Sequence, residues 1–343
     1  MKFNRLGNTG LKVSEVCLGA MTFGSNFYTI AQVDQAGADE MVKAAIEGGV
    51  NFFDTADIYS YGESETVLGQ ALRNTGLGRD KYLIASKVRA GMSEGAITGT
   101  SDHNNVGLSR HHILSSVEGS LRRLGTDYID LYQVHGWDIA TPLEETLRAL
   151  EDLVRQGKVR YLGCSNFAAR HLAKALVLAG ERGWDRFVSL QTYYSLVARD
   201  IEHELLPLCR EEGVGVLPWS PLSGGFLTGK YRREGVVETG GRRTRGAFPP
   251  IDEERGYDAV EALDAIAKDR GVTIAQVALA WILAQKGITS VIIGANKMSQ
   301  LNDNLKAIEI QLTSEELATL SATTQPPTQY PGWMYIHQNQ NRL

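Results

Sequence analysis

The sequence predicts an α/β protein that folds as one (β/α)8 TIM barrel, with an N-terminal β-hairpin before it and an extra C-terminal helix and tail after it. Short apolar segments alternate strictly with amphipathic segments of helical period, and the alternation repeats eight times. Strict alternation implies parallel strands, and a sheet of eight parallel strands is of the size that closes into a barrel. No predicted strand leads into the Gly-x-Gly-x-x-Gly turn of a doubly wound sheet. The barrel is therefore favoured over that alternative.

The predicted elements follow one another in a regular order. Residues 1–14 contain an Asn-Thr-Gly turn between two short runs, which is typical of a hairpin. The predicted strands are 16–19, 51–54, 82–87, 128–135, 159–165, 188–194, 214–219 and 290–294. The predicted helices are 38–47, 63–73, 110–124, 143–156, 169–179, 202–212, 257–269, 274–285 and 299–308.

Three segments lie outside this alternation. Residues 91–107 form a polar, glycine-rich excursion, and residues 222–250 form a long loop rich in glycine and arginine. The tail, 310–343, contains a short helix at 314–323 and then an aromatic, proline-rich ending. The chain of 343 residues exceeds the usual size of a single-core domain, but it has no linker at mid-chain. Residues 1–343 are therefore predicted to form one barrel domain.

Composition excludes several classes of function. A formal net charge of -5 argues against a nucleic-acid surface, and the short basic cluster 242–245 is typical of a solvated loop. The longest apolar run, 277–284, is too short to cross a membrane. Three cysteines without pairable spacing indicate a reducing compartment, so a cytoplasmic location is expected. The histidines show no metal-ligand spacing, and no metal is predicted.

Four ionisable residues fall at the ends of predicted strands. Asp54 ends the second strand, Tyr59 lies in the following loop, Lys87 ends the third strand and His135 ends the fourth. The carboxyl ends of the strands of a barrel meet at one rim, so these four side chains are expected to converge. Any one of them alone would fit a satisfied core position, whereas four at one rim indicate chemistry. We predict that all four are catalytic.

These residue types suit proton transfer to or from oxygen. An ammonium group beside a tyrosine hydroxyl favours the phenolate and is expected to lower the pKa of Tyr59, while Asp54 holds Lys87 charged and oriented. His135 can donate a hydrogen bond to a carbonyl oxygen. The set has no nucleophile and no metal, so hydride from C4 of a nicotinamide is the natural electron source, with Tyr59 supplying the proton.

Barrels of this type bind phosphate at the loops after the seventh and eighth strands. Here those loops are Trp219-Ser-Pro-Leu-Ser-Gly224 and Gly294-Ala-Asn-Lys297, and the second leads into a helix N-terminus that favours phosphate. Residues at the ends of the fifth and sixth strands could bind other parts of a ligand. The side chains of Ser165, Asn166 and Gln191 could hydrogen-bond a carboxamide, and Tyr194 could stack on a flat ring.

The chain resembles the aldo-keto reductase family over nearly its whole length. The matching motifs are Phe53-Asp-Thr-Ala-Asp-Ile-Tyr59 with Gly62, Ser86-Lys87, Asp130-Leu-Tyr-Gln-Val-His135, Gly163-Cys-Ser-Asn166, Gln191 and Trp219-Ser-Pro-Leu222. The chain is similar to the larger bacterial members, which are related to the potassium-channel β subunits. The resemblance implies reduction of an aldehyde or ketone to an alcohol, or the reverse. It also implies a catalytic tetrad of Asp54, Tyr59, Lys87 and His135, with Tyr59 as the acid/base.

The resemblance also implies the binding residues. Tyr59, His135 and Trp137 are expected to meet the substrate, a small carbonyl compound or alcohol, and the 222–250 loop is expected to cover the cofactor. Cofactor contacts are expected at Gly19, Met21, Asp54, Ser165, Asn166, Gln191, Trp219, Ser220, Pro221, Leu222, Gly224, Lys230, Gly294, Asn296, Lys297, Gln300, Asp303 and Asn304.

Two departures from the family pattern affect specificity. Some relatives carry an arginine at the position of Gln300, where it meets the 2'-phosphate of NADP. Here Lys297 would supply that charge, helped by an arginine at 242, 243 or 245, so NADP (NADPH) is expected and NAD is the alternative. Trp137 follows Gly136 at the rim and could be a substrate wall or a loop anchor. Other walls are expected from 25–32, 91–107 and the tail beyond 326.

Two other functions compete with this hypothesis. The run from Gly224 to Lys230 matches most of a phosphate-binding loop of nucleotide hydrolases, but Tyr231 stands where a Ser or Thr would meet magnesium. That function is therefore disfavoured. The second is a barrel that keeps NADP as a redox sensor and binds a partner with little turnover. Turnover of small aldehydes would separate it from an enzyme.

Overall fold

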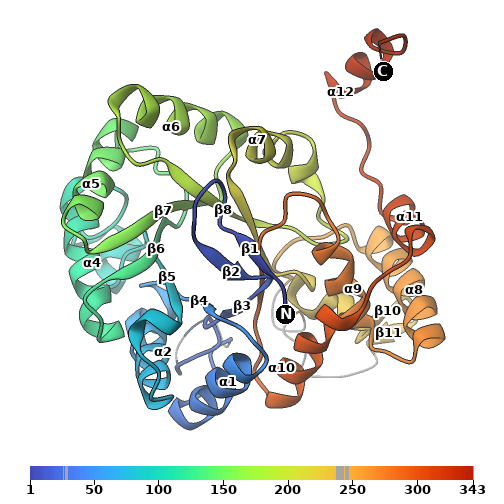
Figure 1. Cartoon of the computed structure of the whole chain (residues 1–343), viewed down its shortest axis with the longest axis horizontal. Helices are drawn as coiled ribbons and strands as arrows, with labels where there is room; N and C mark the ends of the chain where they lie inside the picture. The colour runs from blue at the N-terminus through green and yellow to red at the C-terminus, as the bar shows by residue number, and fades with distance from the viewer. Residues whose placement is uncertain (26, 28–29, 237–242, 244–246, 343) are drawn as a thin grey trace.

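The computed structural model describes residues 1–25, 27, 30–236, 243 and 247–342. Eight parallel strands form a nearly closed barrel in the order β12-β3-β4-β5-β6-β7-β8-β9, and helices surround it (Figure 1). The ring is completed where Thr289, just before β12, donates its backbone N–H to Val216 O of β9 over 2.9 Å. This arrangement confirms the predicted TIM barrel.

The barrel strands are close to the predicted ones and differ mainly by a residue or two at each end. They are β3 (Val16–Gly19), β4 (Phe52–Asp54), β5 (Leu83–Val88), β6 (Ile129–Val134), β7 (Val159–Ser165), β8 (Phe187–Tyr193), β9 (Gly215–Trp219) and β12 (Val291–Ile293). Two antiparallel ribbons lie outside the barrel sheet. They are the predicted hairpin, β1 (Phe3–Arg5) with β2 (Lys12–Ser14), and an unpredicted one in the 222–250 loop, β10 (Tyr231–Arg232) with β11 (Gly235–Val236).

The helices follow the strands as predicted. The longer ones are α1 (Gln35–Glu47), α2 (Glu63–Asn74), α4 (Arg110–Leu124), α5 (Leu143–Arg155), α6 (Ala169–Arg182), α7 (Leu205–Glu212), α8 (Glu253–Arg270), α9 (Ile274–Leu283), α10 (Met298–Leu305) and α11 (Ser314–Thr323). The short ones are η1 (Tyr59–Gly62), η2 (Arg79–Lys81), α3 (Glu94–Thr98), η3 (Asp200–Glu202), η4 (Ser223–Thr228), η6 (Lys306–Glu309) and α12 (Gly332–Gln338).

Helix α5 shows why these segments are helical and face the sheet. Its buried residues include Leu143, Leu147, Leu150 and Leu153, which recur at helical spacing on one face, while the opposite face is charged. Fully burying one such leucine contributes roughly 1.5 to 3 kcal/mol of stability. The same pattern ties the outer ring of helices to the barrel.

The sequence analysis missed several short helices, among them the α-helices α3 and α12. In the 91–107 segment, Ser93 caps α3 by accepting a hydrogen bond from Ala96 N, and Gly99 ends it in the left-handed conformation. The C-terminal helix α12 has no buried residue, and Figure 1 shows it standing apart from the barrel at the end of the tail. An exposed helix of seven residues has no core contact to signal it in the sequence.

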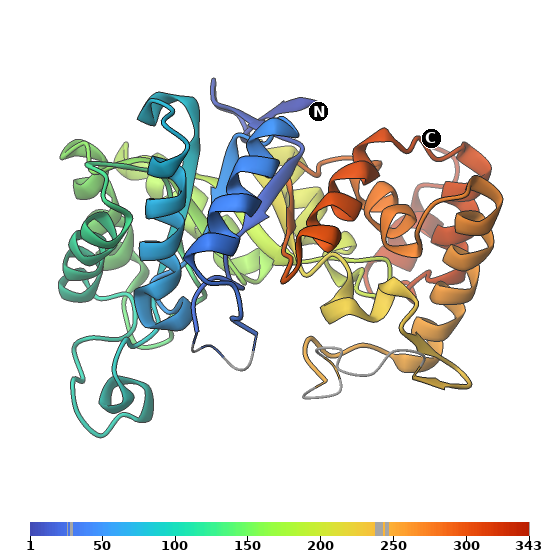
Figure 2. The same cartoon turned by 90° about the horizontal axis from the view of Figure 1, so that it is seen from below.

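The hairpin closes the end of the barrel opposite the predicted site. Leu6 directly follows β1, and Val13 lies in β2. Both pack in an interior cluster with Cys17, Phe52 and Leu131, which lie near the starts of barrel strands. Figure 2 shows the N-terminal ribbon at one end of the barrel and, at the other, the 91–107 segment and the described part of the 222–250 segment. The carboxyl ends of the strands therefore open on the side that carries the long loops.

Candidate active site

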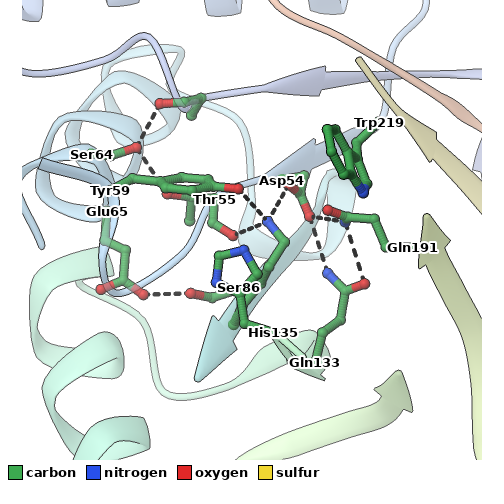
Figure 3. Close-up of polar contacts among 12 residues, drawn as sticks. Asp54, Thr55, Tyr59, Ser64, Glu65, Ser86, Gln133, His135, Gln191 and Trp219 are labelled. Carbon is green, nitrogen blue, oxygen red and sulfur yellow. Dashed lines mark hydrogen bonds and ion pairs between the residues drawn. The ribbon is translucent and has the colours of Figure 1, made fainter. Parts of the chain in front are cut away.

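The four predicted catalytic residues meet at the carboxyl end of the barrel: Figure 3 shows Asp54, Tyr59 and His135 together, and Lys87 contacts both Asp54 and Tyr59. Asp54 is the last residue of β4, Lys87 lies in β5, His135 follows β6 directly, and Tyr59 begins η1. Parallel pairing of Asp54 with Ala85 in β5 brings these strand ends to one level. The predicted convergence is therefore present in the structure.

A buried ion pair forms the centre of this group. Lys87 Nζ lies 2.5 Å from Asp54 Oδ2, and it also donates to Thr55 O at 2.8 Å and to Tyr59 OH at 3.3 Å. Burial lowers the pKa of Lys87, but attraction to Asp54 and Tyr59 and the hydrogen bonds to both together outweigh it, and the net pKa lies above the ordinary value. Lys87 is therefore a fixed ammonium group aimed at the tyrosine hydroxyl.

Tyr59 differs from the sequence prediction in one respect. Burial raises the pKa of its hydroxyl, the ammonium of Lys87 lowers it, and the net pKa stays above the ordinary value. The predicted lowering was wrong because burial of the ring outweighs the neighbouring charge. Tyr59 is thus a neutral phenol at neutral pH, and a phenol is the form that can give up a proton.

His135 completes the group as a neutral imidazole. Burial, with repulsion from Lys87 and Arg89, holds the pKa of His135 well below its ordinary value. Its ring lies edge-on to the ring of Tyr59, with centroids 5.7 Å apart. A neutral imidazole carries one N–H donor, which can bind a carbonyl oxygen held between the two rings.

The structure adds a residue that the sequence analysis did not single out. Gln133 Nε2 donates to Asp54 Oδ1 at 3.1 Å, and Gln191 Nε2 donates to the same oxygen at 2.8 Å (Figure 3). Gln133 lies in β6 two residues before His135, so alternation along a strand puts both on one face. A polar residue at an inward-facing barrel position was the signal that could have identified it.

Gly163 makes room for Gln133. The two residues are partners across β6 and β7. A Cβ atom on Gly163 would lie 2.5 Å from Ser189 Oγ and 3.0 Å from Gln133 Cγ. Any larger residue would push these buried side chains apart, so the glycine is required by close packing.

We expect Gly163→Ala to lower the free energy of unfolding by about 1–3 kcal/mol, the usual range for overpacking a filled core. Gly180→Ala is the matched control, because its added Cβ would have no described atom within 4 Å and Gly180 lies in α6. Alanine there should be neutral or stabilise the fold by up to about 1 kcal/mol. Urea unfolding of both variants measures the difference, and equal stabilities would contradict this packing argument.

The predicted carboxamide contacts behave differently from one another. Ser165 Oγ is buried and has no hydrogen-bond partner among the described residues. Asn166 has a positive φ of 56°, accepts from Trp219 Nε1 at 3.1 Å and donates to His135 O at 3.0 Å. Gln191 turns its amide nitrogen inward to Asp54. An unsatisfied buried hydroxyl is costly unless a ligand supplies its partner, so Ser165 fits a polar ligand here.

The prediction that Tyr194 stacks on a ligand ring was wrong, because its ring is buried. Tyr194 is fully buried against Trp281, and its hydroxyl donates to Glu202 Oε1 at 2.7 Å. Its neighbour Tyr193 instead stacks on Trp219, with ring centroids 4.9 Å apart, and Phe248 stacks on Trp219 at 6.0 Å. Alternation along β8 sends adjacent tyrosines to opposite faces, so the register decides which one reaches the rim.

The loop after β9 contains residues in the left-handed backbone conformation. Ser220 and Ser223 both have φ of 51°, and Ser220 Oγ accepts from Gly224 N at 3.0 Å. A Cβ atom on Gly224 would lie 2.7 Å from Phe248 O. Non-glycine residues in this conformation often mark functional loops. The turn formed by Trp219, Ser220, Pro221 and Leu222 thus leads directly into η4, in which Gly224 is tightly packed.

The loop after β12 places Lys297 at the N-cap of α10, where its side chain is exposed. Gln300 Oε1 accepts from Asn296 N at 3.0 Å and so braces this turn. Asp303 is tied to α9 through Thr273 and Gln276, and Asn304 is buried. Among the predicted cofactor contacts in this loop, Lys297 therefore presents its positive charge to solvent beside the N-terminus of α10.

Other predicted cofactor residues line the same end of the barrel or its loops. Gly19 ends β3, and Gly294 directly follows β12. Met21 lies in the turn after β3, and Lys230 follows η4. Of the three arginines predicted to help Lys297, Arg242 and Arg245 lie outside the described residues, as do residues 26, 28 and 29 of the predicted 25–32 wall. Arg243 donates to Pro249 O at 2.6 Å and so braces the 222–250 loop.

Trp137 is held by neighbouring rings. Its indole stacks on His171 with centroids 3.9 Å apart and meets Phe167 edge-on at 5.4 Å. Its backbone oxygen accepts from Arg89 Nε at 3.1 Å. These contacts favour the loop-anchor interpretation over the substrate-wall interpretation.

Phe27 was not predicted individually, and its ring lies 5.3 Å from the ring of Tyr59. Within the described part of the chain, no group of three or more potential metal ligands is present, and no helix is long and apolar enough to cross a membrane. The ring of Phe27 thus lies at the rim beside Tyr59.

Comparison with known proteins places these features in context. The model of the aldo/keto reductase family matches residues 15–324. The chain is 40% identical to the uncharacterized oxidoreductase YrpG of Bacillus subtilis, over 94% of this chain and 95% of that protein. It is 37% identical to a putative aryl-alcohol dehydrogenase of Schizosaccharomyces pombe, over 92% of this chain and 93% of that protein. It is 35% identical to a probable voltage-gated potassium channel subunit beta of Arabidopsis thaliana, over 90% of this chain and 92% of that protein.

Proposed function

The chain belongs to the aldo/keto reductase family, and we propose that it uses NADPH to reduce an aldehyde or ketone to an alcohol, or catalyses the reverse oxidation. The observation that carries this proposal is the geometry of Tyr59. Its neutral hydroxyl lies 3.3 Å from the ammonium of Lys87 and beside the neutral ring of His135. This arrangement suits proton transfer to a carbonyl oxygen.

Each residue of the tetrad has a distinct role in this mechanism. His135 donates a hydrogen bond that holds and polarises the carbonyl oxygen. Tyr59 gives its proton to that oxygen, and Lys87 stabilises the negative charge that develops on the tyrosine. Asp54 keeps Lys87 charged and aimed at Tyr59. In the oxidative direction the same groups remove the proton from an alcohol.

The side chains present fit a nicotinamide dinucleotide. When bound, the nicotinamide would supply the hydride that the tetrad cannot provide. Ser165, with its unpaired buried hydroxyl, and the neighbouring Asn166 and Gln191 would hold the carboxamide. The turn after Trp219 and the N-terminus of α10 would hold the phosphates through backbone N–H groups. The 222–250 loop would cover the cofactor.

Aryl aldehydes, with the corresponding aryl alcohols as products, are the proposed substrate class. The ring of Phe27 lies beside Tyr59, and the ring of Trp219 stacks on those of Tyr193 and Phe248. Aromatic pairs contribute about 0.5 to 1.5 kcal/mol beyond the burial of their area, so a flat aromatic substrate gains from such walls. The similarity to a putative aryl-alcohol dehydrogenase of Schizosaccharomyces pombe supports this class.

A cytoplasmic location agrees with this chemistry. The three cysteines Cys17, Cys164 and Cys209 are free and buried. A reducing compartment keeps such thiols unpaired, and it also maintains the reduced nicotinamide that carbonyl reduction consumes.

The test is a turnover screen of the purified protein with benzaldehydes, aliphatic aldehydes, ketones and sugars, each with NADPH and NADH. We expect NADPH oxidation to be fastest with aryl aldehydes. Tight NADPH binding without turnover on any carbonyl would favour the redox-sensing or partner-binding alternative, which the similarity to a potassium channel subunit beta raises. Faster turnover with aliphatic aldehydes would contradict the proposed substrate class.

Lys297→Ala is expected to weaken NADPH binding about ten- to a hundredfold while NADH binding changes less than twofold. The exposed ammonium at the N-cap of α10 would attract a 2'-phosphate, and a charge-assisted hydrogen bond contributes roughly 1.5 to 3 kcal/mol. Titration of both cofactors by fluorescence measures the difference. Lys306→Ala, in η6, is the matched control and should leave both affinities unchanged. Equal loss for both cofactors would indicate a structural role for Lys297.

A further inference from the structure

The carboxylate of Asp54 is held by three side chains inside the barrel. Lys87 binds Oδ2, whereas Gln133 and Gln191 both donate to Oδ1 (Figure 3). Asp54 and Gln191 are each 3% exposed and Gln133 is 0% exposed, so these groups are shielded from bulk solvent. The ion pair with Lys87 alone does not require two amides on the second oxygen.

The orientation of the two amides follows from the carboxylate. An ionised carboxylate can only accept hydrogen bonds, so each glutamine must present its nitrogen to Asp54. Gln133 Oε1 then faces Gln191 Nε2 at 3.4 Å and accepts its second N–H. Both N–H groups of Gln191 are therefore used inside the barrel in this state.

Gln191 also lies beside the proposed carboxamide site, whereas Gln133 contacts Asp54 from another strand. Gln191 pairs in register with Ser165 across β7 and β8, and its backbone oxygen accepts from Asn166 N at 3.0 Å. Ser165 carries the unpaired buried hydroxyl at the proposed carboxamide site. If Gln191 turns its amide toward a carboxamide, it leaves Asp54 Oδ1, and a buried charged oxygen would then lack a partner unless another donor remains.

We propose that Gln133 is a positioning residue that keeps Asp54 paired and aimed at Lys87 while Gln191 turns to the carboxamide of the bound nicotinamide. This inference rests on the proposed function, and it assigns a role to a residue outside the catalytic tetrad. Gln133 acts through Asp54 and does not touch the substrate. The missing side chain at Gly163 provides the space that this glutamine occupies.

The proposal predicts an unusual dependence between the two glutamines. Without cofactor, each amide can replace the other on Asp54 Oδ1, so losing one should have a small effect. With cofactor bound, only Gln133 remains on that oxygen. Removing Gln133 should therefore weaken cofactor binding only when Gln191 is present to make the exchange.

A double-mutant cycle tests this dependence with Gln133→Met, Gln191→Met and the double variant, in which methionine keeps the size of the side chain but removes its amide. The dissociation constant for NADPH is measured by quenching of tryptophan fluorescence. Gln133→Met should raise the dissociation constant for NADPH about tenfold in the otherwise unchanged chain. In the Gln191→Met background, the same substitution should raise it less than twofold. In the cofactor-free protein, the double variant should lose more thermal stability than the sum of the single losses.

Other outcomes would overturn the inference in distinct ways. An equal increase in both backgrounds would show that Gln133 only supports the fold, and no increase in either would show that it does not act on the bound state. Additive losses of thermal stability would contradict the shared role at Asp54 Oδ1. Failure of the unmodified protein to bind either NADPH or NADH would overturn the proposed function, and this inference with it.

Discussion

Replacing Tyr59 by phenylalanine is expected to lower kcat for aldehyde reduction by about a hundred- to ten-thousandfold, the range in which a positioned acid or base contributes. The substitution removes only the hydroxyl that faces Lys87 Nζ at 3.3 Å. The ammonium keeps Asp54 Oδ2 and Thr55 O as acceptors, so the ion pair should survive. NADPH affinity should change less than about twofold. Steady-state kinetics and cofactor titration measure both effects.

Tyr61→Phe is the matched control for this variant. Tyr61 lies in the same short helix η1, two residues beyond Tyr59, and its side chain is 47% exposed. Loss of its hydroxyl removes no contact with the tetrad, so kcat should stay within about twofold of the unmodified enzyme. A Tyr59→Phe variant that keeps more than about a tenth of the normal rate would contradict the assignment of Tyr59 as proton donor.

Replacing Lys87 by methionine is expected to lower the free energy of unfolding by about 3–5 kcal/mol and to abolish measurable turnover. Lys87 and Asp54 have side-chain exposures of 0% and 4%, so the substitution leaves a buried carboxylate without its cation. Catalysis should be lost because nothing then stabilises negative charge on Tyr59. Urea unfolding at pH 7 and initial rates measure the two effects.

The double variant Lys87→Met with Asp54→Asn separates stability from catalysis. Removing both charges leaves an amide oxygen that can still accept from Gln133 and Gln191, so at least half of the lost stability should return. Turnover should not return, because the ammonium is still missing. If the double variant were no more stable than Lys87→Met alone, the loss would not come from an uncompensated charge, and the role given to this ion pair would be wrong.

The fold and the convergence of the four predicted catalytic residues followed from the sequence because each depends on local pattern and on strand order. Asp54, Lys87 and His135 stand at the ends of apolar runs, and the parallel order of a barrel brings such ends together regardless of exact register. Their convergence needed no knowledge of side-chain packing. The N-terminal hairpin could likewise be predicted from its Asn-Thr-Gly turn.

Other features depend on which face of a strand a residue occupies, and this is set by register. The choice between Tyr193 and Tyr194 changes with a shift of one residue, and only the structure shows that Tyr193 stacks on Trp219. The net direction of the pKa of Tyr59 depended on how deeply the ring is buried. Gln133 was hidden for a similar reason, since its role comes from a contact with Asp54 79 residues away.

Isotopic labelling tests most directly whether hydride passes to the carbonyl carbon while Tyr59 supplies the proton. NADPH deuterated at C4 on the transferred side is incubated with the purified protein and an aryl aldehyde in ordinary water, and the alcohol is examined by mass spectrometry and proton NMR. We expect one deuterium on the carbinol carbon and none on oxygen, at a rate that Tyr59→Phe reduces at least a hundredfold. Alcohol without deuterium, or no alcohol despite tight NADPH binding, would contradict this expectation.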